Sequence, residues 1–141
     1  MSVGYSPDLR MTVICQEPDG VPAHRFVTDL GFLPASVPGA SGSKIFGISE
    51  YAAQFGEAIT VITSGSGLVT ADDVAGIYRT NTIAGTPPVS SVTVTDNGSF
   101  VTASAEGKAI ASTTASASDV GFVAPGSYAK LADDLIEVIL Q

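Results

Sequence analysis

The sequence predicts an all-β protein, and three observations carry this prediction. Several runs are rich in Val, Ile and Thr, residues that favour the pleated, half-buried surface of a strand. The dipeptide Asn97-Gly98 separates two such runs and is typical of a tight hairpin turn. No stretch keeps the 3.6-residue periodicity of a long helix. We therefore expect a small β-barrel or sandwich with two or three short helical turns.

The composition limits how this fold is stabilised. The chain has 141 residues, a usual size for one domain, and it is 45% hydrophobic but only 7% aromatic. Its single cysteine, Cys15, excludes an internal disulfide. Stability must therefore come from a packed core of Val, Ile, Leu and Ala.

Proline interrupts the first third of the chain, at Pro7, Pro18, Pro22, Pro34 and Pro38. Proline at this spacing breaks both helices and sheet ladders. Residues 1–43 are therefore expected to form an extended N-terminal arm with one strand at Met11 to Cys15, ending in a linker of small residues at 34–43. A compact β domain is expected over residues 44–141.

The first part of this domain is predicted as strand, helical turn, strand. The strands are expected at Ile45 to Ile48 and at Ala58 to Thr63, with a turn between them that Ser49 caps and Gly56 closes. Thr70 to Asp73 has the form of a capping box and predicts a second helical turn.

A similar order returns near the C-terminus. Gly121-Phe122-Val123 corresponds to Gly47-Ile48 in the first part of the domain. Ile136-Glu137-Val138-Ile139 corresponds to Ile59-Thr60-Val61-Ile62. Between them, Ser127 to Leu131 corresponds to Ser49 to Ala53. This echo predicts two related strand–turn–strand units within one fold.

Between these units lies the predicted hairpin. Pairing Asp96 with Ser99 across the Asn97-Gly98 turn sets Val94 opposite Val101, and Val92 opposite Ala103. The next stretch, residues 103–118, is almost wholly Ala, Ser, Thr and Gly, and a strand is expected within it at Lys108 to Ser112.

The charge balance excludes several classes of partner. Fourteen acidic residues against six basic ones give a net charge of −8, which disfavours nucleic acid and anionic membrane surfaces. Only 14% of residues are charged, so part of the surface is expected to be covered by another protein or by copies of the chain. Neither a secretory signal nor an 18-residue apolar run is found, which predicts synthesis in a cytoplasm.

Groups that could carry chemistry are few. The only histidine, His24, has no nucleophile elbow nearby, and nothing around Cys15 indicates an electropositive pocket. Asp72-Asp73 and Asp133-Asp134 lack the spacing of a calcium loop, and Gly65-Ser66-Gly67 lacks the lysine of a phosphate loop. The sequence therefore predicts no enzyme, no cofactor and no metal site.

Short motifs carry a resemblance to a known family. They are Gly107-Lys108-Ala109, Val120-Gly121-Phe122-Val123, Leu135 to Leu140, and Phe46 to Ser49 followed by Gly56 to Val61. This pattern resembles the trimeric head-decoration (cement) proteins of tailed phages. The resemblance implies a β-tulip-like fold, a homotrimer on the outer capsid surface of the virion, the major capsid protein as partner, and no catalytic residues.

Two segments are the candidates for binding partners. The apolar side chains of the arm and of the C-terminal strand are expected to make the contacts: Phe26, Leu30, Phe32, Leu33, Ile136, Val138 and Leu140. The C-terminal strand is apolar on both faces apart from Glu137, so it is expected to need cover on two sides, and this predicts the trimer. The alternatives are a carbohydrate- or host-surface-binding module of a phage fibre, suggested by Pro88 to Val94, and another small head or tail subunit.

Overall fold

The protein consists of two antiparallel sheets, seen in a computed structural model that describes residues 9–36, 44–72, 100–112, 119–124 and 133–140. The first sheet has the order β1-β4-β3-β2, with β1 at Leu9–Ile14, β2 at Phe26–Thr28, β3 at Ile45–Ser49 and β4 at Ala58–Ser64. The second has the order β5-β9-β8-β6-β7, with β5 at Ser66–Thr70, β6 at Phe100–Ala103, β7 at Ala109–Ser112, β8 at Gly121–Val123 and β9 at Leu135–Leu140.

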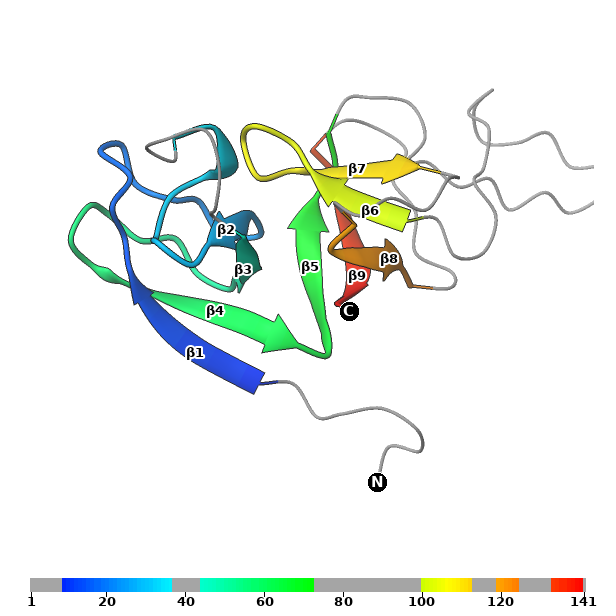
Figure 1. Cartoon of the computed structure of the whole chain (residues 1–141), viewed down its shortest axis with the longest axis horizontal. Helices are drawn as coiled ribbons and strands as arrows, with labels where there is room; N and C mark the ends of the chain where they lie inside the picture. The colour runs from blue at the N-terminus through cyan, green and yellow to red at the C-terminus, as the bar shows by residue number, and fades with distance from the viewer. Residues whose placement is uncertain (1–8, 37–43, 73–99, 113–118, 125–132, 141) are drawn as a thin grey trace, which may run out of the picture.

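The main core lies between the two sheets, which stand side by side in Figure 1. The first sheet contributes Phe26, Ile48 and Ile62. The second sheet and the residue after β5 contribute Val69, Ala71, Val101, Ala109, Val123, Ile136 and Val138. Burial of such side chains is the main stabilising term in a protein with no disulfide.

A second cluster lies on the opposite face of the first sheet. Val27, Ile59 and Val61 pack there against Cys15, Val21 and Ala53, which lie in or beside the connecting loops. The first sheet is therefore apolar on both faces, one covered by the second sheet and the other by loops.

The all-β prediction is confirmed, and the arrangement is sandwich-like, since neither sheet closes into a barrel within the described residues. The strands predicted at 45–48, 58–63 and 108–112 match β3, β4 and β7 to within one residue at each end. The strand predicted at 11–15 is β1, which begins two residues earlier and ends one residue earlier.

The prediction that residues 1–43 form an arm outside the core is wrong for residues 9–36. β1 pairs with β4, and β2 pairs with β3. Phe26 and Val27 are fully buried. The prolines of this segment do not prevent these strands because Pro18 and Pro22 lie in the connection between β1 and β2, and Pro34 begins a short 3-10 helix at Pro34–Ser36.

The helical turn predicted between Ser49 and Gly56 is wrong, and the one predicted from Thr70 to Asp73 lies partly outside the described residues. Ser49 ends β3 instead of capping a helix: its buried hydroxyl donates to the Pro22 carbonyl at 2.7 Å and accepts from the Arg25 amide at 3.1 Å. Thr70 ends β5, while Asp73 lies outside the described residues. Ser49 therefore holds the loop before β2 onto the end of β3.

The predicted hairpin pairing is also wrong at the one strand that can be observed. Val101 pairs with Ala111 on one side and with Gly121 on the other, so no edge is left there for Val94. The side chain of Val101 is fully buried. Residues 89–99, including the Asn97-Gly98 turn, lie outside the described residues.

The predicted echo is confirmed and extends over both sheets. Ile48 pairs with Ile62, as Phe122 pairs with Ile139. The other ladders correspond in the same way. Met11 pairs with Val61, as Gly67 pairs with Val138. Phe26 pairs with Ile48, as Phe100 pairs with Phe122. The order β1-β4-β3-β2 is thus repeated as β5-β9-β8-β6, and β7 is an addition at the edge. Residues 127–131, the middle of the predicted echo, lie outside the described part.

The repeat includes hydrogen bonds outside the strands. The amide of Cys15 donates to the carbonyl of Glu57 at 2.8 Å, and the amide of Ala71 donates to that of Asp134 at 2.8 Å. The amide of Gly56 donates back to the carbonyl of Cys15, and the amide of Asp133 donates back to the carbonyl of Ala71. Gly56 and Asp133 both have a positive φ, of 84° and 69°. The two halves, residues 9–64 and 66–140, are therefore two versions of one Greek-key unit.

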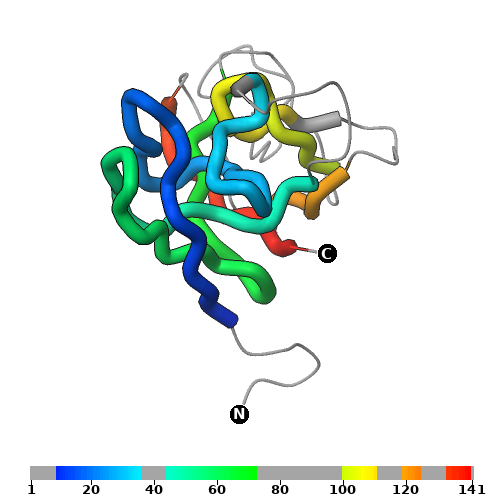
Figure 2. Tube along the Cα trace, turned by 60° about the vertical axis from the view of Figure 1, so that its left-hand side comes forward, coloured from blue at the N-terminus to red at the C-terminus, as the bar shows by residue number. Residues whose placement is uncertain are grey.

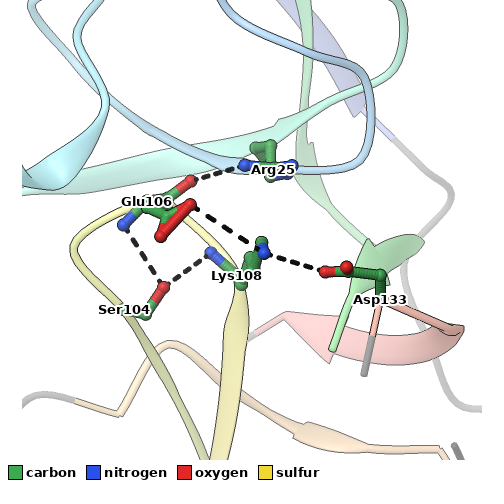
Figure 3. A network of polar contacts seen from close by, with 5 residues as sticks. All are labelled: Arg25, Ser104, Glu106, Lys108 and Asp133. Atoms are coloured by element: carbon green, nitrogen blue, oxygen red, sulfur yellow. Dashed lines mark hydrogen bonds and ion pairs between the residues drawn. The ribbon is translucent and has the colours of Figure 1, made fainter. Parts of the chain in front are cut away.

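A small set of polar contacts joins the halves. The turn at residues 104–108 lies against residues 24–26, where the amide of Phe26 donates to the carbonyl of Gly107 at 2.7 Å. Arg25 donates to the carbonyl of Glu106 at 3.1 Å (Figure 3). Within the second half, Lys108 of the same turn forms an ion pair with Asp133 at 2.8 Å. The Asp133 carboxylate raises the pKa of Lys108.

The repeat predicts two positions where only glycine fits. A Cβ on Gly47 would lie 2.1 Å from the carbonyl oxygen of Ile62, and a Cβ on Gly121 would lie 2.2 Å from that of Ile139. We expect Gly47→Ala and Gly121→Ala each to lower the free energy of unfolding by about 1–3 kcal/mol or more, measured by urea denaturation. The control is Gly56→Asn, which places a residue tolerant of positive φ in open space and should cost less than about 1 kcal/mol. Equal losses in all three variants would contradict the shared register.

Candidate protein-interaction surface

The structure separates the seven predicted contact residues into buried and accessible groups. Phe26, Ile136 and Val138 are fully buried between the two sheets, so they stabilise the fold and present no surface to a partner. Leu30 is 52% exposed on the turn after β2. Phe32, Leu33 and Leu140 are half-buried. The prediction of partner contacts through the three buried side chains is therefore wrong.

The C-terminal strand receives one of its two expected covers from the same chain. β9 lies between β5 and β8, and its inward side chains pack on the first sheet. On its other face, Leu135 is 43% exposed and Ile139 is half-buried. The argument that both faces of this strand need a second subunit thus holds for one face at most.

β1 is the most exposed strand that the structure describes. Within the first sheet it pairs with β4 alone, and it lies at the margin of the molecule in Figure 1 and Figure 2. Five of its six residues are exposed, among them Leu9 at 53%, Met11 at 48% and Ile14 at 49%. Proteins usually protect such an edge with proline, lysine or a covering loop. Exposed apolar side chains on such a strand suit contact with another protein.

The only charged side chain on β1 is held by the chain itself. The guanidinium of Arg10 donates to both carboxylate oxygens of Glu50, at 2.7 and 2.9 Å. This hydrogen bonding from Arg10 lowers the pKa of Glu50 from its ordinary value of 4.5. The pair crosses β4, so it ties the edge strand to the end of β3 and leaves the edge without net charge.

A separate hollow opens at the far end of the first sheet. It is shallow, has a volume of about 680 Å³, and is lined by residues 19–22, 52–55 and Glu57. Phe55 in its wall is 61% exposed, and Tyr51 in the same loop is 65% exposed. The paired amides and carbonyls of Val21 and Ala53 form the bridge that holds the two loops together.

The side chains considered for chemistry do not form one cluster among the described residues, although the backbone of Ala71, beside Asp72, pairs with Asp133 and Asp134. Cys15 is fully buried in the second cluster, and His24 has a positive φ of 64° in the loop before β2, where its carbonyl accepts from the Thr70 amide. Asp133 pairs with Lys108, and Asp73 lies outside the described part of the chain. Among the described residues no three His, Cys, Asp or Glu side chains gather as a metal site would require.

No family model matches the chain, and no curated protein or solved structure is significantly similar to it. In the part of the chain that the structure describes, no helix is long and apolar enough to cross a membrane. The functional interpretation therefore depends on the surface just described.

Two features of this surface were not predicted from the sequence. β1 was expected in a separate arm, so its position at the edge of the first sheet, as far as the chain is described, was missed. The signal was a stretch without proline between Pro7 and Pro18, which contains the six residues of β1. The hollow that Phe55 lines has no signal in the sequence. Asp19 and Phe55 are far apart along the chain, and the bridge between Val21 and Ala53 brings their loops together.

The Arg10–Glu50 pair predicts a pH dependence. Because the pKa of Glu50 is lowered on folding, the stability from this pair is present above about pH 4.5 and is lost as the pH falls through the folded-state pKa. A double-mutant cycle of Arg10→Gln and Glu50→Gln should give a coupling of about 0.2–1 kcal/mol near neutral pH, because exposed pairs are screened by water. Urea unfolding at about pH 3 should give a smaller coupling. A coupling unchanged by acid would contradict the pairing.

Proposed function

We propose that this protein is a non-enzymatic structural protein of a tailed-phage virion, which binds the outer surface of the capsid as a homo-oligomer and stabilises the head lattice. Its partners would be the major capsid protein and other copies of itself. The protein would be made in the host cytoplasm and would act on the virion without a cofactor.

The single observation that supports this proposal best is the exposed apolar side chains of β1, a strand that pairs with β4 alone among the described strands. A small protein with a net charge of −8 and few charged residues has little to attract nucleic acid, whereas a strand that exposes Leu9, Met11 and Ile14 suits contact with another protein. A symmetric oligomer would multiply weak contacts on a repeating lattice. The motif resemblance to head-decoration proteins gives the capsid as the specific surface.

The mode of binding differs from the one that the sequence predicts. An arm of residues 1–43 was expected to drape over the capsid as a detachable segment, but β1 and β2 lie within the first sheet. We therefore assign the contact to exposed side chains on a folded body, with Leu30 as the accessible member of the predicted set.

A carbohydrate- or host-surface-binding role is the second candidate, favoured by the exposed Tyr51 and Phe55 beside the hollow. Aromatic faces next to polar groups are a common way to hold a sugar ring. Glycan binding that is lost in Tyr51→Ser would favour this role over the first.

Binding to undecorated heads tests the proposal. The purified protein should sediment with expanded heads of the phage that encodes it and should raise the temperature at which they break. Leu30→Asp should weaken this binding about tenfold, because a charge would replace an apolar contact, while circular dichroism stays unchanged.

Tyr51→Ser is the matched control, since it alters an equally exposed side chain on another loop and should bind heads normally. Absence of sedimentation by the wild-type protein would contradict the capsid role. Gene order gives an independent check, because the proposal expects the gene to lie beside that of the major capsid protein.

A further inference from the structure

We infer that the hollow at the far end of the first sheet binds an arginine side chain of another protein. The hollow lies between the loop that joins β1 to β2 and the loop that joins β3 to β4. This inference goes beyond the proposed function, because it assigns a second contact site that depends neither on Leu30 nor on the capsid as the partner.

The walls of the hollow are fixed by the fold. Val21 and Ala53 are buried in the second cluster, and their amides donate to each other's carbonyls at 2.8 and 2.9 Å. Gly20 has a φ of 83°, and a Cβ there would lie 2.8 Å from the carbonyl oxygen of Ala53, so the two loops approach as closely as glycine allows. A ligand would therefore meet a surface that is formed before it binds.

The hollow has few hydrogen-bond donors to offer. Five of its lining residues already donate their amides inside the protein: Gly20, Val21, Ala53, Gln54 and Glu57. Pro22 has no amide, and Gln54 carries the one side-chain N–H in the lining. A ligand that needs to accept many hydrogen bonds would therefore fit this lining poorly.

Acceptors and negative charge dominate the lining instead. Asp19 and Glu57 are both exposed, and neither forms a salt bridge within the part of the chain that the structure describes. No basic residue lines the hollow. A guanidinium group matches such a lining, since it has five N–H donors and no acceptor, whereas sugar hydroxyls both donate and accept. The charge of the lining thus favours a cation over a sugar.

Phe55 favours arginine over lysine as that cation. Its side chain is 61% exposed in the wall of the hollow. A guanidinium group is planar and weakly hydrated, so it can stack on an aromatic ring while its N–H groups pair with a carboxylate, whereas an ammonium group is a strongly hydrated point charge. The net charge of −8 would also attract a basic partner at longer range.

Titration of the isotopically labelled protein with a blocked Gly-Arg-Gly peptide, followed by NMR, tests the inference. The amide signals of Gly20, Gln54 and Phe55 should shift as the peptide is added. A peptide with citrulline in place of arginine keeps the planar shape without the charge, and it should leave these signals unmoved. Raising the salt from about 0.01 M to about 0.15 M should weaken binding, because the Debye length falls from about 30 to about 8 Å.

Variants of the lining give the second measurement. Asp19→Asn and Phe55→Leu should each weaken binding of the arginine peptide about threefold or more, while circular dichroism stays unchanged because both side chains are exposed. Tyr51→Ser is the matched control. It removes an equally exposed aromatic side chain that does not line the hollow, so it should bind the peptide normally.

Equal shifts with the citrulline peptide, or no shifts with the arginine peptide, would overturn the inference. Shifts with glucose and none with the arginine peptide would assign the hollow to a sugar, and the same shifts on concentrating the protein alone would assign it to a second copy. Either result would also overturn it. No phage heads are used, so these outcomes leave the capsid proposal unchanged, and failure to bind heads would leave the arginine site unchanged.

Discussion

The packing of one face of the first sheet into the second sheet is the interaction on which the rest of the structure depends. Phe26, Ile48 and Ile62 fill the space over Val101 and Val138. Each such side chain contributes about 1.5–3 kcal/mol when fully buried, and no disulfide supports the fold. The contact also explains the sharp corner at Gly65, with a φ of 85°, where β4 ends and β5 begins in the other sheet.

The repeat makes the two halves comparable, and their differences point to function. Phe100, Phe122 and Ile139 occupy the positions of Phe26, Ile48 and Ile62, but they lie on the outer face of the second sheet and are half-buried. The two sheets therefore pack through faces that are not equivalent in the repeat: the face with Phe26 contacts the face with Val101, which corresponds to Val27. β5 becomes internal in this arrangement, whereas five of the six residues of β1 stay exposed.

The sequence predicts strands well wherever local signals are strong. β-branched runs place β3, β4 and β9, and the echo between Gly47 and Gly121 has a physical basis, because both glycines allow the facing strand to approach closely. Proline density led to the wrong role for residues 9–36, since it reports local breaks and not the long-range pairing of β1 with β4. Phe26 and Ile136 were predicted as contact residues because an apolar side chain has the same sequence signal in a core and on an interface.

Residue-resolved hydrogen exchange of the β1 amides tests whether residues 9–14 belong to the first sheet or to a separate arm. Amides alternate in direction along a strand, so those of Met11 and Val13 lie on the same side as that of Cys15, which donates to the carbonyl of Glu57. The amides of Met11 and Val13, which point toward β4, should exchange slowly at every protein concentration. Fast exchange of both amides would contradict the place of β1 in the sheet and would favour the separate arm that the sequence predicts.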